Sequence, residues 1–214
     1  MSKTPSSDPI HARTRESLIL AAGAVFAEQG FRAATVRDIC KSAGANVAAV
    51  NYHFRDKAGL YRAVWQYSHH CALRKYPLQH GASEDAKPQD KLRAYISSFL
   101  LRIFDKGEIA WFGKLISREM IEPTPVLEAL VKEEIQPQLI YLSGIVRCIL
   151  GPKATDIQVQ RSAMSVVSQC VFYHHCGPVI RHLLPHLTFS KSQIEELADH
   201  IYKFSLAAMK GLGK

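Results

Sequence analysis

The segment 46–57 concentrates side chains that suit the surface of a nucleic acid. Two small residues, Ala48 and Ala49, lie just before Asn51, whose amide group both donates and accepts hydrogen bonds. Three further donors follow in quick succession: Tyr52, His53 and Lys57. Small side chains let a helix approach the floor of the DNA major groove, an Asn amide can pair with N6 and N7 of adenine, and such donors hold phosphates. The segment therefore predicts contact with a DNA duplex.

Four helices are expected to position these side chains. Apolar residues recur at helical spacing over 13–29, and Gly30 is a natural stop for that first helix. A short helix then begins at Thr35 and ends at Ala43-Gly44, and a second short helix begins at Asn46. Asp56 precedes a long helix through Cys71. Thr, Asn and Asp each cap the free amides at a helix start, so the order is long, short, turn, short, long, which is typical of a helix-turn-helix.

Other residues around this motif have both a DNA-binding and a structural interpretation. Arg37 lies in the first turn of the preceding helix, where it can reach a guanine or a phosphate or remain a solvated surface residue. Val47 can meet a thymine methyl group or simply pack, and packing is also the alternative for Asn51. The basic residues near the chain start can reach an adjacent minor groove; these are Lys3, His11, Arg13 and Arg15. The main expectation, however, is that residues 1–12 form an unstructured arm.

Residues 13–65 closely resemble the DNA-binding domain of TetR-family transcriptional regulators. The matching segments are Thr14-Arg-Glu, Ala21-Ala22, Phe26-Ala-Glu-x-Gly30-Phe, Thr35-Val-Arg-Asp-Ile39, Ala43-Gly44 and Tyr52-His-Phe-x-x-Lys57. The segment 45–54 and the helical second part also resemble the CecR-type subgroup. The resemblance implies an all-α fold and these DNA contacts: Thr35, Arg37, Asn46, Val47, Ala48, Ala49, Asn51, Tyr52, His53 and Lys57. Arg55 departs from the small residue or Pro usual in this turn and is expected to add a phosphate contact.

The charge of the chain is concentrated in the same region. The 214 residues carry 27 Lys and Arg against 19 Asp and Glu, a net charge of +8 with His neutral. Residues 1–76 hold 4 Lys and 7 Arg against 5 acidic residues, so this part has a net charge of +6 and the remainder only +2. Such an asymmetry indicates a module that binds a polyanion, joined to a nearly neutral second domain.

The second part of the chain is also expected to be helical. Apolar residues at helical spacing cover 92–104 and 111–120, and a third pattern over 126–150 contains Pro137, which predicts a kink or a break. Thr155-x-x-Gln158 and Ser190-x-x-Gln193 are capping boxes at the starts of two final helices. The expected organisation is an arm over 1–12, a helix-turn-helix domain over 13–57 and a helical regulatory and dimerisation domain over 58–214.

The resemblance also implies what this second domain does. It predicts a homodimer on a palindromic DNA operator, paired through the last two long helices, although a core within one chain would look similar in sequence. The expected interface residues are Ala163, Val166, Val167, Cys170, Ile194, Leu197, Ile201 and Ala208. It further predicts a cavity for an unidentified small-molecule effector, lined by Tyr95, Phe99, Trp111, Phe112, Arg118 and Met120. Repression is the usual effect in such regulators.

Other classes of protein fit the sequence less well. A metal or redox sensor could use His174 and His175 with Cys170 and Cys176, or the run His69-His70-Cys71, but adjacent residues fan around a helix and surround an ion poorly. No G-x-S-x-G, H-E-x-x-H, Walker A or G-x-G-x-x-G motif suggests an enzyme. No cofactor and no structural metal are expected. Scattered cysteines, no membrane span and no secretory signal favour the cytoplasm.

Overall fold

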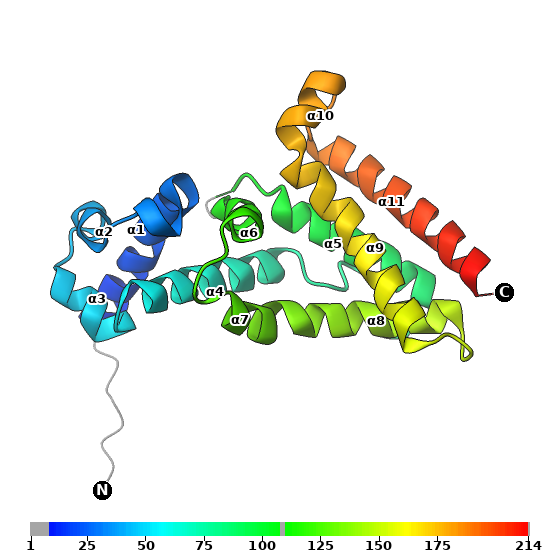
Figure 1. Cartoon of the computed structure of the whole chain (residues 1–214), viewed down its shortest axis with the longest axis horizontal. Helices are drawn as coiled ribbons and strands as arrows, with labels where there is room; N and C mark the ends of the chain where they lie inside the picture. Colours follow the sequence, from blue (N-terminus) through cyan, green and yellow to red (C-terminus); the bar gives the residue numbers. More distant parts are fainter. Residues whose placement is uncertain (1–8, 108–109, 214) are drawn as a thin grey trace, which may run out of the picture.

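The computed structural model describes residues 9–107 and 110–213, and this part of the chain consists of helices, turns and loops without a strand. The expected all-α fold is therefore confirmed (Figure 1). Its elements are α1 Pro9–Ala33, α2 Val36–Ala43, α3 Val47–Phe54, α4 Lys57–Lys75, α5 Pro88–Ile103, α6 Trp111–Ile121, α7 Leu127–Leu130, a π-helix Val131–Ile135, α8 Gln136–Leu150, α9 Asp156–His175, α10 Gly177–Leu183 and α11 Lys191–Leu212. None of the helices described combines the length and the apolar character that a membrane crossing requires.

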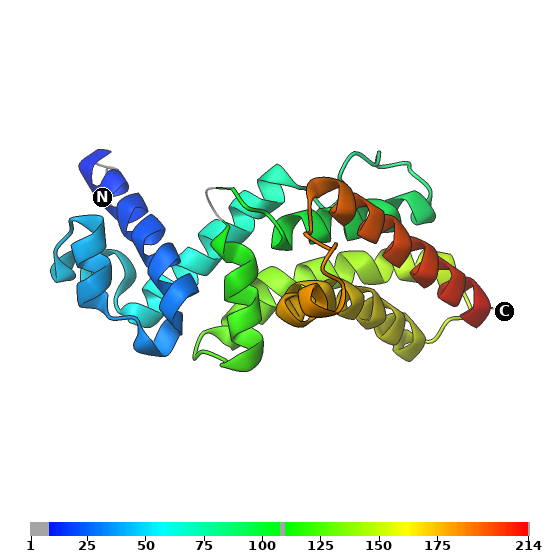
Figure 2. The same cartoon turned by 90° about the horizontal axis from the view of Figure 1, so that it is seen from above.

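The molecule is elongated, with α1, α2 and α3 at one end and the C-terminal end of α11 toward the other (Figures 1 and 2). We call the first three helices the head and the bundle from α5 onward the body. Helix α4 starts in the head and runs along into the body, while α6 packs against both α1 and α4. Two helices therefore connect the head to the body.

Side-chain caps define the short helices of the head. The Thr35 hydroxyl accepts a hydrogen bond from the Asp38 amide at 3.1 Å, and Asn46 Oδ1 accepts one from the Ala48 amide at 3.0 Å. Asp56 Oδ1 accepts from the Gly59 amide at 2.8 Å at the start of α4. These caps confirm the helix starts that the sequence predicts. Inward-facing side chains of α2 and α3 then pack on α1 and α4: Ile39, Cys40, Val50 and Phe54.

Helix α1 is longer at both ends than the expected 13–29. It already includes residues 9–12, so this part of the predicted arm is helical, whereas residues 1–8, with Lys3, lie outside the described residues. At its other end it continues past Gly30 to Ala33. Gly30 has φ +82° and ψ 168°, non-helical values that glycine adopts without a steric cost, so the regular helix is interrupted at Gly30 as expected, and a short helical turn follows the kink.

The body follows the predicted pattern with two differences. Both capping boxes are present, at Thr155 for α9 and at Ser190 for α11. Pro137 lies in the first turn of α8, where the missing N–H costs nothing, and the irregularity is the π-helix just before it. The short helix α10, which begins at Gly177-Pro178, was not predicted.

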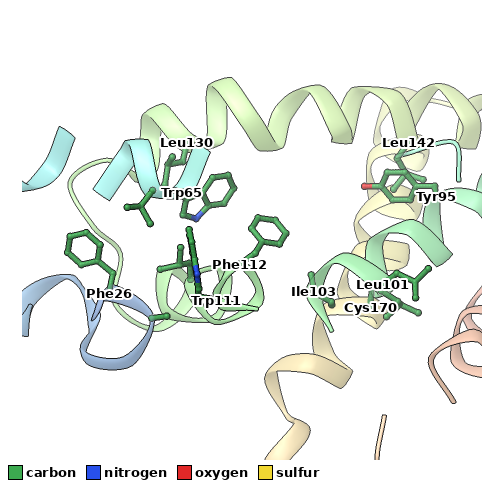
Figure 3. Close-up of a cluster of buried hydrophobic side chains, with 14 of the residues drawn as sticks. Phe26, Trp65, Tyr95, Leu101, Ile103, Trp111, Phe112, Leu130, Leu142 and Cys170 are labelled. Carbon is green, nitrogen blue, oxygen red and sulfur yellow. The ribbon is translucent and has the colours of Figure 1, made fainter. Parts of the chain in front are cut away.

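The buried side chains form one cluster, and Figure 3 shows two groups of its members side by side. One group lies where α1, α4 and α6 meet and contains Phe26, Trp65, Trp111 and Phe112. The other lies among α5, α8 and α9 and contains Tyr95, Leu101, Ile103, Leu142 and Cys170. Helices α5 and α8 pack on each other and on α9 and α11, so the second group is the centre of the body.

Candidate nucleic-acid interface

Helix α3 presents one face to solvent and the opposite face to the head. Val50 and Phe54, four residues apart, are buried. The exposed side consists of Val47, Ala48, Asn51 and Tyr52. These positions share one face of a helix, so an Asn amide with small neighbours projects from the surface without a packing role. The interpretation of Asn51 as a packing residue is therefore wrong, and its side chain is free to read a base edge.

Two of the expected DNA contacts also hold the helices in place. Asn46 uses its carbonyl oxygen to cap α3, and its amide N–H groups remain for a ligand. The Thr35 hydroxyl, besides accepting from the Asp38 amide, lies 2.6 Å from Asp38 Oδ2 and donates to that carboxylate. Ala49 is half-buried against the core, whereas Arg37 is exposed in the first turn of α2.

Aromatic and basic side chains gather at the end of α3. The Tyr52 ring is 74% exposed and lies 4.8 Å from the His53 ring and 5.6 Å from the His11 ring, measured between centroids. The Arg15 guanidinium lies 5.4 Å above the Phe54 ring. His11, Arg13 and Arg15 therefore belong to the first turns of α1 and extend the basic surface beside α3. Sequence reasoning placed His11 in an unstructured arm, and no local signal pairs it with Tyr52.

His53 carries a perturbed imidazole. Partial burial, followed by repulsion from His11 and Arg15, lowers the pKa of His53 below its usual value. The ring is therefore mostly neutral at pH 7, and it offers one N–H donor to a phosphate and no full positive charge.

Lys57 contacts the protein through the same group that was expected to hold a phosphate. Its ammonium donates to the Arg32 carbonyl at 3.2 Å and lies 4.7 Å from the centre of the Phe31 ring. An ammonium has three donors, so one such bond leaves others for a phosphate. Lys57 thus ties the start of α4 to the end of α1 and can contact DNA from that position.

The turn between α3 and α4 is unusually tight. Arg55 has φ +73° and ψ −47°, a region in which non-glycine residues are strained. Gly59 lies so close to the Phe54 carbonyl that a Cβ atom at position 59 would collide with the carbonyl oxygen. This close approach fixes the direction of α4 relative to α3.

Contacts of α1 with α6 and with Glu122, which follows α6, connect the head to the body. Trp111 packs on Gly23, and Arg118 donates to the Ala27 carbonyl at 3.0 Å and to the Glu28 carbonyl at 2.5 Å. Arg32 Nε and Glu122 Oε1 form an ion pair at 2.8 Å. Arg118 is therefore engaged with α1 in this structure, and Met120 is 53% exposed. Sequence periodicity could not reveal that this face of α6 meets α1.

Helix α4 is also linked to α6 through a buried carboxylate. The Tyr61 hydroxyl donates to Glu119 Oε1 at 2.7 Å, and the Thr124 amide and hydroxyl donate to the same carboxylate at 3.1 and 2.8 Å. Burial and the bond to Glu119 raise the pKa of Tyr61, so the phenol stays protonated. Glu119 is thus a structural anchor between α4 and α6.

The other residues expected in the effector pocket occupy two places. Trp111 is buried against α1, and the Phe112 ring lies 5.7 Å from the Trp65 ring and 5.6 Å from the His69 ring. Tyr95 is buried and Phe99 half-buried in the body, with their centroids 6.2 Å apart. Tyr95, Phe99 and Phe112 remain candidates for contact with an effector.

The proposed sensor residues near the end of α9 do not assemble into a metal site within the described part of one chain. Cys170 is fully buried, and burial raises the pKa of its thiol to about 12, which keeps it protonated. His174 is mostly buried and lies 3.2 Å from the Ser117 hydroxyl. Across the described residues, the group of His, Cys, Asp and Glu side chains with ligand atoms within 4.8 Å of one another is His69, His70 and Glu134.

The expected dimer residues need correction. Five of them face the core of their own chain and are at most 5% exposed: Ala163, Val166, Cys170, Ile194 and Ile201. Val167 and Leu197 are half-buried against that core, and only Ala208 is exposed. The outer faces of α9 and α11 carry other large apolar side chains, Met164 and Phe172 on α9 and Phe204 and Leu212 on α11, each more than half exposed. Helices α9 and α11 are present as the sequence predicts, but most of the residues expected at the interface face the core of their own chain.

Comparison with known proteins identifies the family. The family model "Bacterial regulatory proteins, tetR family" matches residues 18–64, and the model for the C-terminal domain of the HTH-type transcriptional dual regulator CecR matches residues 88–209. The CecR protein of Shigella flexneri is 30% identical over 156 residues, which cover 69% of each chain. The chain belongs to the TetR family. It is thus a transcriptional regulator with a DNA-binding head, and not an enzyme.

Solved structures of TetR-family regulators share this fold. PfmR from Thermus thermophilus superimposes with a TM-score of 0.65 at 17% identity, over 96% of this chain and 97% of that one. SCO4454 from Streptomyces coelicolor gives a TM-score of 0.67 at 16% identity, over 93% and 97%. AibR, solved in complex with isovaleryl coenzyme A and operator DNA, gives 0.66 at 15% identity, over 89% and 97%.

Proposed function

We propose that this TetR-family regulator binds a palindromic operator as a homodimer and is released from it by a small organic effector, so that it acts in the cytoplasm as a ligand-responsive repressor. The observation that carries the proposal is the outer face of α3, where Asn51 projects between Ala48 and Tyr52 without a packing role. An exposed amide beside small side chains suits base reading in the major groove. Arg37, His53, Arg55 and Lys57 surround this face with donors for phosphates.

A dimer is needed because a single recognition helix contacts only a short stretch of groove. Two-fold dimers place two such helices in successive major grooves and therefore read inverted repeats. The exposed apolar side chains of α9 and α11, namely Met164, Phe172, Phe204 and Leu212, supply a surface that pairing would bury. AibR, which has the same fold, was crystallised with operator DNA and a coenzyme A ester, and this supports an operator and an effector here.

The route from effector to DNA runs through the two connections described above. Helix α4 begins right after α3 and continues into the body, and α6 holds α1 through Gly23, Arg118 and Arg32. A shift of α4 or α6 therefore changes the orientation of α3. An effector lowers DNA affinity only to the extent that it binds the released conformation more tightly than the operator-bound one.

Selection from a random duplex library at near-physiological salt tests the proposal. Purified protein should enrich an inverted repeat whose half-sites lie about one helical turn apart. Replacement of Phe204 and Leu212 by Ser should yield a monomer that no longer selects the repeat. Retention of duplexes without enrichment would show that the head binds DNA only as a polyanion and would overturn the proposal.

A further inference from the structure

Arg102 is a cation buried in the body without a carboxylate partner among the described residues. The residue is 3% exposed and lies on α5 between Leu101 and Ile103, which Figure 3 labels. Its Nε donates to the Ser98 carbonyl at 3.3 Å and its Nη1 to Gln138 Oε1 at 2.5 Å. Its Nη2 has no hydrogen-bond partner in the part of the chain that the structure describes. Burial lowers the pKa of Arg102 to about 10, so the guanidinium remains charged at pH 7.

The carboxylate of Glu134, which lies near Arg102 through a chain of hydrogen bonds, already interacts with two histidines. Gln138 Nε2 lies 2.8 Å from His69 Nε2, and His69 Nδ1 lies 2.6 Å from Glu134 Oε2. His70 Nε2 lies 3.3 Å from the same oxygen. A hydrogen-bonded chain therefore runs from Arg102 through Gln138 and His69 to Glu134, and Arg102 is separated from the acid by an amide and an imidazole.

A second buried donor without a partner lies beside this chain. Trp65 is 2% exposed, its Nε1 has no acceptor among the described residues, and its ring lies 5.3 Å from the His69 ring. A buried indole N–H normally finds an acceptor, and a buried charge is normally paired. Two buried donors, both adjacent to the same hydrogen-bonded residues, indicate a need for an acceptor that the described residues do not supply.

We propose that Arg102 binds the carboxylate of a small organic acid, which is the effector of this regulator, with the aromatic side chains around it holding the apolar part of the acid. This inference rests on the proposed function, since it names the chemical class of the effector. Phe99, whose ring lies 5.5 Å from the guanidinium, is the apolar neighbour of Arg102. Phe112 packs on Trp65 and His69, further along the hydrogen-bonded chain.

A monocarboxylate suits these residues better than a phosphate. One guanidinium supplies a single positive charge, and the indole N–H of Trp65 beside the chain is a neutral donor. Both amide N–H groups of Gln138 are already directed at His69 and at the Glu134 carbonyl. Glu134, which is separated from Arg102 by the Gln138 amide and the His69 imidazole, would repel a second negative charge. A planar carboxylate accepts from guanidinium N–H groups in good geometry, and a monoanion restores neutrality.

Binding at Arg102 would reach the head through the same hydrogen bonds. A carboxylate that draws the guanidinium away from Gln138 changes the bond between Gln138 and His69. His69 and Trp65 belong to α4, the helix that leads directly to α3. The acid would thus alter the position of α4 by changing contacts of α5 and α8.

The test is thermal unfolding of the DNA-free protein with acids and their matched neutral amides. The panel spans acetate to decanoate and benzoate to naphthylacetate, each paired with its amide at equal ionic strength. We expect at least one acid to raise the unfolding temperature by about 2 °C or more while its amide does not, because a ligand that binds only the folded state stabilises it. Arg102→Met should abolish this difference between acid and amide. The acid that stabilises the protein should also release it from the duplexes enriched in the library selection.

The matched control is Arg93→Met on the same helix, where the exposed Arg93 pairs with Asp199. It should leave the difference between acid and amide unchanged. If Arg102→Met does not fold, Arg102→Lys and Arg102→Gln serve instead, with the acid effect weakened in the first and absent in the second. Equal shifts by acids and amides, no shift by any acid, or an acid effect that survives in Arg102→Met or Arg102→Gln would overturn the inference. The thermal measurements need no operator, so they fail or succeed independently of the selection experiment.

Discussion

Gly23 of α1 lies directly against the indole ring of Trp111 of α6, so closely that a methyl group at position 23 would fall 2.5 Å from Trp111 Cζ2. This distance is far shorter than a normal carbon–carbon contact. The contact joins the head to the body at a point about midway along α1. One turn further along α1, the Ala27 and Glu28 carbonyls accept hydrogen bonds from Arg118 of α6. The fit between these two residues sets how closely the head approaches the body.

Gly23→Ala should therefore separate the head from α6. Because the indole is buried and cannot swing freely, we expect a loss of about 1–3 kcal/mol in the free energy of unfolding, typical of an overpacked core. Denaturant unfolding measures this loss. Gly144→Ala is the matched control, since position 144 is also helical and has no atom within 4 Å of a new methyl group, and it should be neutral or stabilising. Equal behaviour of the two variants would contradict the close contact.

Asn51→Ala should relax base preference without changing stability. The side chain is exposed and has no packing role in the head, so the unfolding temperature should stay the same. Loss of a bidentate contact with adenine costs about 1–3 kcal/mol at one position of each half-site. The Asn51→Ala protein should bind the selected repeat only about as tightly as it binds a repeat in which the base pair read by Asn51 has been changed. If the preference at every position persists, Asn51 does not read a base.

Lys57→Ala should weaken binding to every DNA sequence to a similar degree. Removal of one phosphate contact from each half-site lowers the slope of log affinity against log salt by about one per protomer, or about two for the dimer. The same variant loses the bond to the Arg32 carbonyl, so a small fall in unfolding temperature should accompany it. Lys57→Gln retains a donor for Arg32 but no charge. It should recover the stability and leave the salt slope low, which separates the two roles of the ammonium.

Arg55→Gly should make the protein more stable and the complex weaker. Glycine adopts φ +73° without steric cost, and the relief of strain exceeds its greater freedom in the unfolded chain, for a net gain of about 1 kcal/mol. Loss of the guanidinium should lower DNA affinity at low salt. Arg55→Ala keeps the strain and loses the charge, so it should show the weaker binding alone. A glycine variant with unchanged stability would mean that the turn is not strained.

Tyr61→Phe should destabilise the connection between α4 and α6. The buried Glu119 carboxylate would keep its two bonds from Thr124 and lose the one from the phenol, at a cost of about 1–3 kcal/mol for a bond to a charged group. Chemical denaturation gives the cost. Tyr52→Phe, at a ring that is 74% exposed, is the control and should not change the unfolding free energy. A cost below about 0.5 kcal/mol for Tyr61→Phe would show that Thr124 or solvent satisfies Glu119 alone.

The head could be predicted well because its signals are local. Thr35, Asn46 and Asp56 cap helices through amides two or three residues away, so their spacing in the sequence already contains the interaction. The close contact between Gly59 and the Phe54 carbonyl also joins residues that are near each other in the sequence. Once the ends of α3 and its two buried positions are known, helical geometry predicts which of its residues face solvent.

The faces of the body helices could not be predicted because they depend on partners far along the chain. Ala163 and Met164 are neighbours with similar apolar character, yet the first is fully buried and the second is 53% exposed. Arg118 donates hydrogen bonds to two carbonyl oxygens of α1, about ninety positions earlier in the sequence, and no local pattern indicates this contact. Only the packed structure contains these relationships.

The π-helix Val131–Ile135 makes the register of α8 depend on the number of residues between Leu130 and Pro137. A π-turn accommodates one residue more than a regular α-turn would, so every side chain that follows is rotated by about 100° relative to an uninterrupted helix. Gln138, which follows the π-turn, meets His69 only in this rotated register. Removal of a single residue between Leu130 and Pro137 would restore a regular helix with nearly the same composition, and Gln138 would point away from Arg102 and α4. Relatives that differ by one residue in this short stretch would therefore share the fold and lack this polar connection.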